Sequence, residues 1–238
     1  MTDPTPRESA PLAGVRACVF DAYGTLFDVA AAAARCSDAL AGRHRELSAL
    51  WRSKQLEYTW LRSLRGDYED FWHVTGQALD FALASFGVSD PALRTRLMEL
   101  YFALDAYPEA PAALRSLRAG GFRCAILSNG SPSMLTAAVQ QSGLDDCLDA
   151  VLSVDPIGIY KPHPSAYQLA VDRLRVAAGE ICFLSSNYWD VSGAARFGFR
   201  VVWINRTGAL RDPTPGEPEH EIMSLAALPA LLGITCEG

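Results

Sequence analysis

The spacing of short apolar runs places the strongest constraint on how this chain can fold. Five such runs lie near residues 16–21, 122–127, 150–154, 181–185 and 200–204, and segments with helical spacing separate them. Strands that alternate with helices form parallel sheets, because each crossover helix returns the chain to the same end of the sheet. We therefore expect an α/β fold whose core is a doubly wound, Rossmann-like parallel sheet.

The first two runs are separated by a segment much longer than a simple crossover. Apolar residues recur there at helical spacing over residues 39–64, 68–86 and 91–104. An insertion directly after the first strand emerges at the carboxyl end of the sheet. The sequence therefore predicts a core domain formed by residues 15–27 and 108–238, an inserted helical cap domain at 28–107, and a polar, proline-rich, flexible tail at 1–14.

A carboxylate follows the first predicted strand at Asp21, where open α/β sheets place their ligands. Taken alone, this residue is explained equally well as a cap for the following turn. Later segments favour a site: Ser128 and Asn129 follow the second strand, Lys161 follows the third, and Asp190 lies just beyond the fourth. Because parallel strands share one carboxyl edge, these groups are expected to converge on one crevice.

At this point the sequence resembles the haloacid dehalogenase superfamily, whose four motifs are a strand-end aspartate, a serine or threonine, a lysine and an acidic cluster. Residues 20–29, 50–64 and 185–190 are similar to the L-2-haloacid dehalogenase branch in particular. Most superfamily members are magnesium-dependent phosphatases with a second aspartate two positions after the first. Here Tyr23 stands at that position, and Ser186 and Asn187 stand where an acidic magnesium ligand is expected. Since Mg²⁺ requires oxygen ligands that include carboxylates, we expect no metal and no cofactor.

The resemblance also implies a reaction. An ionised Asp21 attacks C2 of an L-2-haloalkanoic acid, expels halide with inversion, and is left as an ester that water then hydrolyses to release a D-2-hydroxyalkanoic acid. The family pattern assigns catalytic roles to Asp21, Thr25, Arg52, Ser128, Lys161, Tyr167, Ser185, Asn187 and Asp190. It assigns substrate binding to Ala22, Tyr23, Arg52, Leu56, Phe71, Ser128, Asn129 and Trp189.

Individual roles also follow from the resemblance. Thr25 orients the nucleophile and Lys161 keeps it ionised, while Ser128 and the backbone N–H groups of residues 22 and 23 hold the substrate carboxylate. Arg52 with Asn129 receives the halide. The groups that orient the attacking water are Ser185, Asn187 and Asp190.

Several of these residues have a structural explanation as well. Taken alone, Arg52 is typical of a solvated arginine on a helix. Asp190 serves equally well as the ion-pair partner of Lys161. Ordinary packing explains Leu56, Phe71 and Tyr167 as well as a site does. We expect Asp28 to cap or pair nearby rather than to join the site.

Composition limits the partners. The net charge is −6 and no basic cluster occurs, which argues against nucleic acid and anionic membranes. No run approaches the ~18 apolar residues of a membrane span, and the N-terminal stretch lacks the apolar region of a signal peptide. The six cysteines form no CxxC pair, which favours a reducing cytoplasm, and the four histidines show no ligand spacing. The resemblance implies a homodimer, in which the aromatic stretch 51–60 either supplies the interface or packs inward.

Three alternatives remain open at this stage. A phosphatase of the same fold needs a general acid and a metal, which Tyr23 and the Ser186–Asn187 pair argue against. A binding protein on this scaffold is expected to lose Asp21 or Lys161, and both are present. A dehalogenase that prefers fluoroacetate would differ only in the volume of its pocket, which the sequence does not reveal.

Overall fold

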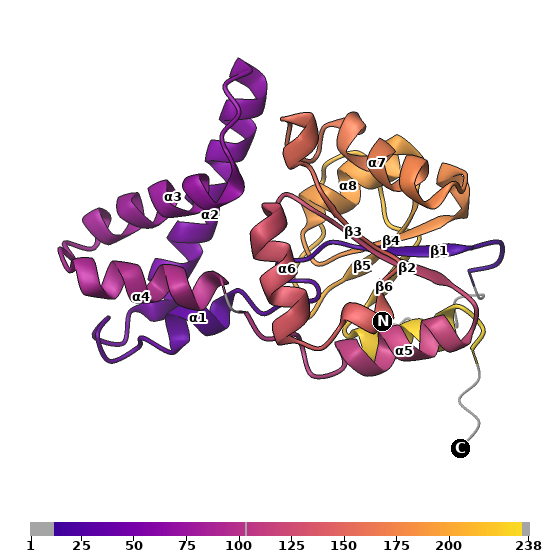
Figure 1. Ribbon diagram of the computed structural model, residues 1–238, viewed down its shortest axis with the longest axis horizontal. Helices are drawn as coiled ribbons and strands as arrows, with labels where there is room; N and C mark the ends of the chain where they lie inside the picture. The colour runs from indigo at the N-terminus through magenta and orange to yellow at the C-terminus, as the bar shows by residue number, and fades with distance from the viewer. Residues whose placement is uncertain (1–11, 103, 235–238) are drawn as a thin grey trace, which may run out of the picture.

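The core of the molecule is a six-stranded parallel sheet with the order β3-β2-β1-β4-β5-β6 (Figure 1). The computed structural model describes residues 12–102 and 104–234. The strands are β1 (Ala17–Phe20), β2 (Arg123–Ser128), β3 (Ala150–Ser153), β4 (Ile181–Ser185), β5 (Arg200–Ile204) and β6 (His220–Ile222). The expected doubly wound α/β fold is confirmed. The sequence does not indicate β6, because three residues are too few to form a recognisable apolar run.

The position of β1 in the middle of the sheet creates the crevice. From β1 the chain fills one side of the sheet with β2 and β3, and β4, β5 and β6 then fill the other side. Phe20, the last residue of β1, pairs with Ile126 of β2 and Leu184 of β4. The direction of winding therefore reverses beside β1, and ligands of open α/β sheets bind outside the carboxyl ends of the strands at such a point.

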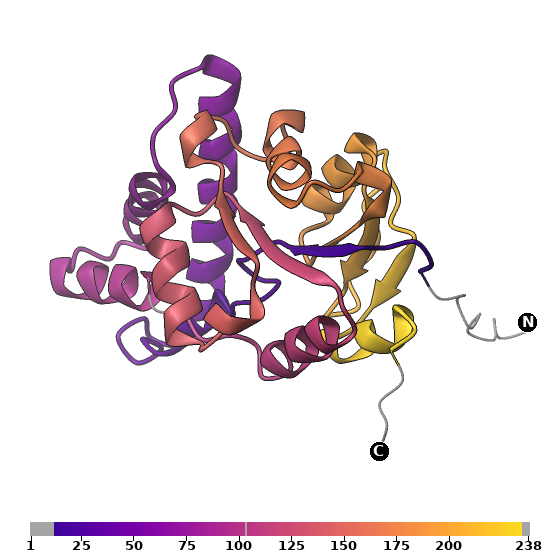
Figure 2. The same cartoon turned by 45° about the vertical axis from the view of Figure 1, so that its right-hand side comes forward.

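Helices cover both faces of the sheet (Figures 1 and 2). The helices of this part are α5 (Ala110–Ala119), α6 (Pro132–Gln141), α7 (Pro164–Leu174), α8 (Tyr188–Phe197) and α9 (Leu228–Leu231). Short 3₁₀ turns occur at η1 (Asp145–Cys147), η2 (Asp155–Ile157), η3 (Ala178–Glu180) and η4 (Leu225–Ala227). Side chains alternate along each strand, so Cys18 and Phe20 of β1 pack with α5, α6 and α9, while Ala17 and Val19 pack with α7 and α8. Both faces are thereby buried, as parallel sheets require.

Four of the helices between β1 and β2 form a separate group beside the sheet in Figures 1 and 2. They are α1 (Ala30–Ala34), α2 (His44–Arg65), α3 (Phe71–Ser85) and α4 (Pro91–Phe102). Asp70 begins α3 by accepting hydrogen bonds from the N–H groups of Trp72 and His73 at 2.8 and 3.0 Å. The helix expected from residue 39 begins only at His44, because Ala41 and Gly42 have φ values of 48° and 78° that interrupt a right-handed helix.

The two linkers that join this group to the sheet run side by side. Phe27 forms an antiparallel bridge with Ala106, the N–H of Tyr107 donates to Leu26 O at 2.8 Å, and the N–H of Asp28 donates to Asp105 O at 3.1 Å. The Asp28 side chain also accepts from the N–H of Ala30 at 2.9 Å, so it contacts its own neighbourhood as expected.

The aromatic stretch 51–60 packs mainly inward. The buried residues of α2 recur every fourth position, at Leu47, Trp51, Gln55 and Thr59. Trp60, also on α2, lies against Trp189 of the core with ring centroids 5.6 Å apart. The outward residues of α2 are different ones, and among them Leu61 is 42% exposed.

The predicted tail at 1–14 needs a correction at its end. Residues 1–11 lie outside the described residues. Leu12, however, is buried in the core and its N–H donates to Leu231 O at 2.9 Å, because an apolar side chain gains by joining the packing of α9. The ordered chain therefore begins before residue 15.

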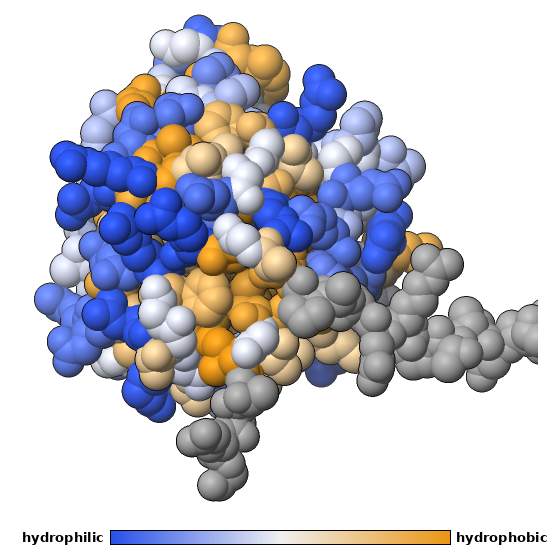
Figure 3. Space-filling model, turned by 90° about the vertical axis from the view of Figure 1, so that its right-hand side faces the viewer, coloured by the Kyte–Doolittle hydropathy of each residue, from blue (hydrophilic) through white to orange (hydrophobic). Residues whose placement is uncertain are grey.

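Polar and apolar side chains are mixed on the face of the molecule that points away from α1–α4 (Figure 3). No helix in the described part of the chain combines the length and the apolar character that a membrane crossing requires.

Candidate active site

Asp21 lies at the carboxyl end of β1, and both of its carboxylate oxygens accept hydrogen bonds. Its Oδ1 accepts from Lys161 Nζ at 2.9 Å. Its Oδ2 accepts from Asn187 Nδ2 at 2.8 Å, from Thr25 Oγ1 at 3.1 Å and from Ser185 Oγ at 3.4 Å. Asp21 is only 5% exposed, so these donors replace the water that would otherwise solvate the carboxylate.

Lys161 holds two carboxylates from inside the protein. Its Nζ donates to Asp21 Oδ1, to Asp190 Oδ2 at 2.6 Å and to Leu127 O at 3.0 Å. Burial by itself lowers the pKa of Lys161, and the charges of Asp190 and Asp21 outweigh this effect and raise it. Lys161 is therefore a permanent cation in the site at neutral pH.

Asp190 is held in turn by two donors. Besides the Lys161 contact at Oδ2, its Oδ1 accepts from Tyr167 OH at 2.8 Å. Burial raises the pKa of Asp190 to about 6, although the charge of Lys161 opposes the shift, so this carboxylate is ionised at neutral pH. The Asp190 side chain is fully buried and each oxygen already has a partner. Of the two roles left open by the sequence, this geometry fits the ion-pair partner of Lys161.

The turn after β1 is tied to the end of β4. The N–H of Ser186 donates to Thr25 Oγ1 at 2.9 Å, so the Thr25 proton is left to donate to Asp21. Asn187 Nδ2 also donates to Tyr23 O at 3.2 Å. These contacts fix the orientation of the groups around the Asp21 carboxylate.

Arg52 reaches this cluster from α2. Its Nη1 donates to Gln55 Oε1 at 2.7 Å and its Nη2 donates to Asn187 Oδ1 at 3.4 Å. The side chain is half-buried and lies between helices and core, unlike a solvated surface arginine. Asn129, its expected partner, instead accepts at Oδ1 from the N–H of Lys161 at 2.9 Å, so the Nδ2 donor end of Asn129 is the end available to an anion.

Aromatic side chains pack together beside the turn that follows Asp21. The Tyr23 ring lies 5.6 Å from that of Phe71 and 5.7 Å from that of Tyr101, centroid to centroid. Gly130 permits this packing, because a Cβ there would lie 2.7 Å from Cε2 of Tyr23. Phe71 is buried, while Leu56 and Trp189 are half-buried.

The remaining predicted residues also lie at the strand ends. Ser128 is the last residue of β2, is fully buried, and accepts from the N–H of Gly130 at 3.0 Å. Ala22 is buried directly after Asp21, and its carbonyl accepts from the N–H groups of Leu26 and Phe27 at 2.9 and 3.0 Å. The structure therefore joins most of the predicted polar residues in one hydrogen-bonded cluster, and Tyr167 belongs to it through Asp190. Ser128 lies at the same edge of the sheet, where its side chain contacts the backbone of Gly130.

Proteins similar to this chain in sequence and fold include 2-haloacid dehalogenases. A family model described as haloacid dehalogenase-like hydrolase matches residues 15–198. The chain belongs to the haloacid dehalogenase-like hydrolase family. It is 50% identical over 219 residues to (S)-2-haloacid dehalogenase 1 from Pseudomonas sp. (strain CBS-3), with 92% of this chain and 96% of that protein covered.

Two further haloacid dehalogenase relatives are similar over nearly their whole length. The (S)-2-haloacid dehalogenase 4A of Burkholderia cepacia is 48% identical, with 92% of this chain and 95% of that protein covered. The structure of L-2-haloacid dehalogenase from Xanthobacter autotrophicus with chloropropionic acid covalently bound is 39% identical, with a TM-score of 0.85 and coverage of 92% of this chain and 98% of that one. These relatives place the chain in the haloacid dehalogenase branch of the family and identify it as an enzyme.

The donor set of this family member does not fit the magnesium ion of the phosphatases. Lys161 Nζ lies within 2.9 Å of Asp21 and 2.6 Å of Asp190, so a cation already bridges the two carboxylates of the site. Within residues 12–102 and 104–234, no group of three or more His, Cys, Asp or Glu side chains is arranged to hold a metal ion.

Sequence reasoning missed the residues that support the site from behind. Gln55 and Tyr101 contact each other beside Arg52, and the Ser186 N–H holds Thr25. The signal for Gln55 was present in the sequence, because it interrupts a buried stripe at every fourth residue of α2 and lies three residues after Arg52. No sequence pattern indicates the partner of Tyr101.

Proposed function

We propose that the protein converts L-2-haloalkanoic acids into D-2-hydroxyalkanoic acids and halide, through an ester on Asp21 and without a metal. One observation carries this proposal. Asp21 is a nearly buried carboxylate with donors on both oxygens, one cationic partner in Lys161, and Tyr23 where a phosphatase needs a second carboxylate. The relatives named above, which include a covalent chloropropionic acid complex, support the same chemistry.

In the first step an oxygen of Asp21 bonds to C2 while the carbon–halogen bond breaks, and the electron pair leaves with the halide. No proton is transferred, so the step needs no general acid at position 23. We assign binding of the halide to the Arg52 guanidinium and to the Nδ2 end of Asn129. Aromatic walls at Tyr23 and Phe71 exclude water from the carboxylate, which strengthens its electrostatic contacts.

In the second step water adds to the carbonyl carbon of the Asp21 ester. The bond between that carbon and the Asp21 oxygen now bonded to C2 then breaks, and this oxygen leaves as the hydroxyl of the product. One proton of the water goes to that hydroxyl and the other is released, while the water oxygen restores the Asp21 carboxylate. Ser185 and Asn187 already donate to an oxygen of Asp21, so they are preorganised to stabilise the oxyanion at this carbon. We assign Asp190 to holding Lys161, because both of its oxygens have partners.

The carboxylate of the substrate also needs an anion site. We assign this role to Ser128 together with the backbone N–H groups of Ala22 and Tyr23, at the edge where β1 and β2 end. A carboxylate bound there lies beside the nucleophile, and this arrangement favours haloacids over haloalkanes that lack the anion.

We also propose that residues 28–107 act as a cap that completes the site. Arg52 and Phe71 come from this segment and contact Asn187 and Tyr23 of the core. Binding and displacement therefore depend on both parts of the chain.

The decisive experiment measures halide release from L- and D-2-chloropropionate, in excess EDTA, by the wild type and by Asp21→Asn. We expect chloride from the L form alone in the wild type and none in the variant, because an amide is not a nucleophile toward C2. A phosphatase would lose its activity in EDTA, and a binding protein would release no halide. Release by the variant at the wild-type rate would remove Asp21 from the mechanism.

A single turnover in ¹⁸O-labelled water tests the ester. If water attacks the carbonyl of Asp21, the first hydroxyacid formed contains unlabelled oxygen from Asp21, and the label enters the enzyme. Labelled product in the first turnover would instead indicate direct attack of water on C2.

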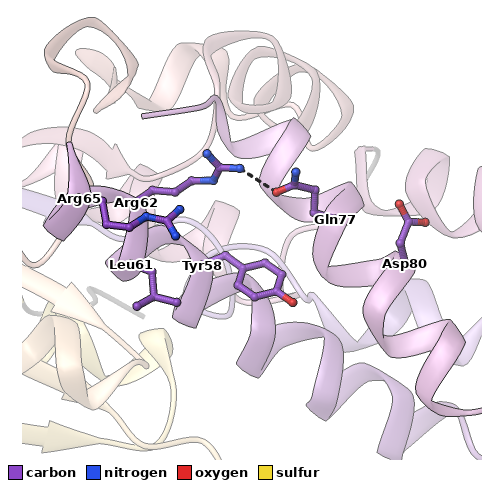
Figure 4. A pocket seen from close by; sticks show the side chains of 6 residues that line it. All are labelled: Tyr58, Leu61, Arg62, Arg65, Gln77 and Asp80. Atoms are coloured by element: carbon purple, nitrogen blue, oxygen red, sulfur yellow. Dashed lines mark hydrogen bonds between the residues drawn. The ribbon is translucent and has the colours of Figure 1, made fainter. Parts of the chain in front are cut away.

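We further propose that two copies of the chain pair through the outer faces of α2 and α3. Leu61 and Phe81 are each 42% exposed there. The face also carries a hollow of about 420 Å³ between the two helices, lined by Tyr58, Leu61, Arg62, Arg65, Gln77 and Asp80 (Figure 4). Apolar groups flanked by both signs of charge suit a two-fold contact with an identical face. Light scattering should give twice 25.8 kDa, and Phe81→Glu should give the single mass; a wild-type monomer contradicts the pairing.

A cytoplasmic location is proposed from the cysteines. Cys18 pairs in register with Cys124 on one side and Cys182 on the other, and all three are free thiols in the core. Burial raises the pKa of Cys124 to about 12, which keeps it protonated and unreactive. Titration of the unfolded, unreduced protein should find all six thiols of the sequence, and a lower count would indicate disulfides.

A further inference from the structure

A buried amide, Gln55, lies directly behind Arg52 on α2. The side chain is fully buried in the stripe that also contains Trp51 and Thr59. A buried amide without partners costs roughly 1–3 kcal/mol. Gln55 avoids this cost by contacting Arg52, Thr75 and Tyr101, so its orientation is determined by those neighbours.

The hydroxyl of Thr75 fixes which end of the amide faces Arg52. Thr75 Oγ1 donates its only proton to Phe71 O at 2.6 Å. It must therefore accept from Gln55, whose Nε2 lies 2.6 Å away. The opposite end, Gln55 Oε1, is thereby turned toward Arg52 Nη1 at 2.7 Å and Tyr101 OH at 3.2 Å.

Tyr101 donates to the same amide oxygen. Burial raises the pKa of Tyr101, so its hydroxyl stays protonated, and its proton points to Gln55 Oε1. One neutral carbonyl oxygen thus accepts from both a cation and a phenol. The Arg52 side chain is fixed from behind by an acceptor that itself cannot rotate.

The charge of Arg52 is not neutralised by these contacts. Its partners, Gln55 Oε1 and Asn187 Oδ1, are both neutral amides. The nearby carboxylates, Asp21 and Asp190, pair with Lys161, and Arg52 forms no ion pair within the described chain. Arginine that faces a carboxylate normally forms a bidentate ion pair, which would occupy the guanidinium.

We infer that Gln55 is a positioning residue for dehalogenation: it holds Arg52 through a neutral oxygen and so leaves the guanidinium charge available to the departing halide. This inference rests on the proposed function. Binding of the halide then depends on two features: Arg52 itself, and a neutral rather than a charged acceptor at Gln55.

The test changes that charge with almost no change in shape. Gln55→Glu places a carboxylate 2.7 Å from Arg52 Nη1 in place of the amide oxygen. We expect kcat for L-2-chloropropionate to fall about tenfold or more, because a neutralised guanidinium stabilises leaving chloride less. Bromide is the better leaving group, so the ratio of kcat for L-2-bromopropionate to that for L-2-chloropropionate should rise at least about threefold. A residue that only packs would leave this ratio unchanged.

The chain contains a matched control. Gln77 Oε1 on α3 accepts from Arg62 Nη2 at 2.9 Å on the outer face of the cap (Figure 4). Gln77→Glu therefore makes the same substitution beside an arginine outside the site, and its kcat ratio should equal that of the wild type.

A second measurement does not depend on turnover. Sodium bromide should raise the Tm of the wild type and of Gln77→Glu by the same amount, and it should raise the Tm of Gln55→Glu less, because only the folded halide site binds the ion. If the wild type releases no halide from any haloacid, the proposed function fails, and the bromide shifts still decide the role of Gln55.

A third variant covers loss of folding. Should Gln55→Glu not fold, Gln55→Met removes the acceptor while keeping most of the volume, and we expect the bromide-to-chloride kcat ratio to rise because Arg52 is no longer held. The inference is overturned if folded Gln55→Glu shows the wild-type kcat ratio and the wild-type bromide shift in Tm. If Gln55→Glu does not fold, the same result for folded Gln55→Met overturns it.

Discussion

Replacing Lys161 by methionine should destabilise the protein in a way that depends on pH. Lys161 Nζ is the charge partner of both Asp21 and Asp190, and its side chain is 1% exposed. Methionine keeps much of the apolar volume, so the main loss is electrostatic. Removing one partner of a buried ion pair typically costs about 3–5 kcal/mol, because the remaining charge is left buried without compensation. We expect a loss of this size near neutral pH.

The pH dependence follows from Asp190. Burial raises the pKa of Asp190 to about 6 even with Lys161 present, so loss of the lysine raises it further. A carboxyl group whose pKa is higher in the folded than in the unfolded state binds more protons when folded, so the unfolding free energy rises as the pH falls between those two values. The variant should therefore regain stability in acid. The difference from the wild type should be largest at about pH 8 and smaller at about pH 5.

The assay is urea unfolding followed by tryptophan fluorescence at both pH values, with Lys161→Met, Asp190→Asn and the double variant. In the double variant Lys161→Met leaves only Asp21, and no longer Asp190, as a buried charge without its partner. Adding Lys161→Met to Asp190→Asn should therefore cost less than it does in the wild type. An equal loss at both pH values, or a loss that grows in acid, would refute the assignment of the destabilisation to unpaired carboxylate.

Three further predictions concern activity and packing. Gly130→Ala should lower the unfolding free energy by roughly 1–3 kcal/mol and raise KM, because the new Cβ would lie 2.7 Å from Cε2 of Tyr23. Gly179→Ala, which has open space around it, should change neither quantity. Urea unfolding and steady-state kinetics of both variants test this. The value of kcat/KM should fall as the pH drops through about 6, because protonated Asp190 no longer pairs with Lys161. If Asp190→Asn shows the same pH profile as the wild type, the fall in acid belongs to a different group. Prolonged dialysis against EDTA should leave halide release unchanged, and restoration of a lost activity by Mg²⁺ would contradict the metal-free site.

The part of the site that could be predicted from the sequence is the part that lies on the sheet. Asp21, Ser185 and Lys161 follow short apolar runs, and the parallel topology alone brings such positions to one edge. The reach of Arg52 into the site depends on how α2 packs, which helical spacing does not determine. Resemblance supplied that residue, whereas the contact that Gln55 makes with it is seen in the structure.

The other features that the sequence did not indicate have specific physical causes. β6 is three residues long and gains its stability from pairing with β5, so its own residues carry little signal. The burial of Leu12 depends on α9, more than two hundred residues later in the chain, and a polar proline-rich neighbourhood conceals it. The roles of Asp190 could be separated only when both of its oxygens were seen to have partners.

The paired linkers have a consequence for how such enzymes diversify. Because Phe27 meets Ala106 and Leu26 meets Tyr107, the chain leaves the sheet and returns to it at one place. Whatever is inserted between these points, short or long, leaves the path of the strands unaltered. The inserted segment, which would select the substrate, can therefore be replaced in evolution while the part that carries the nucleophile is retained. Exchange of residues 28–105 between relatives in the laboratory would use the same two connection points.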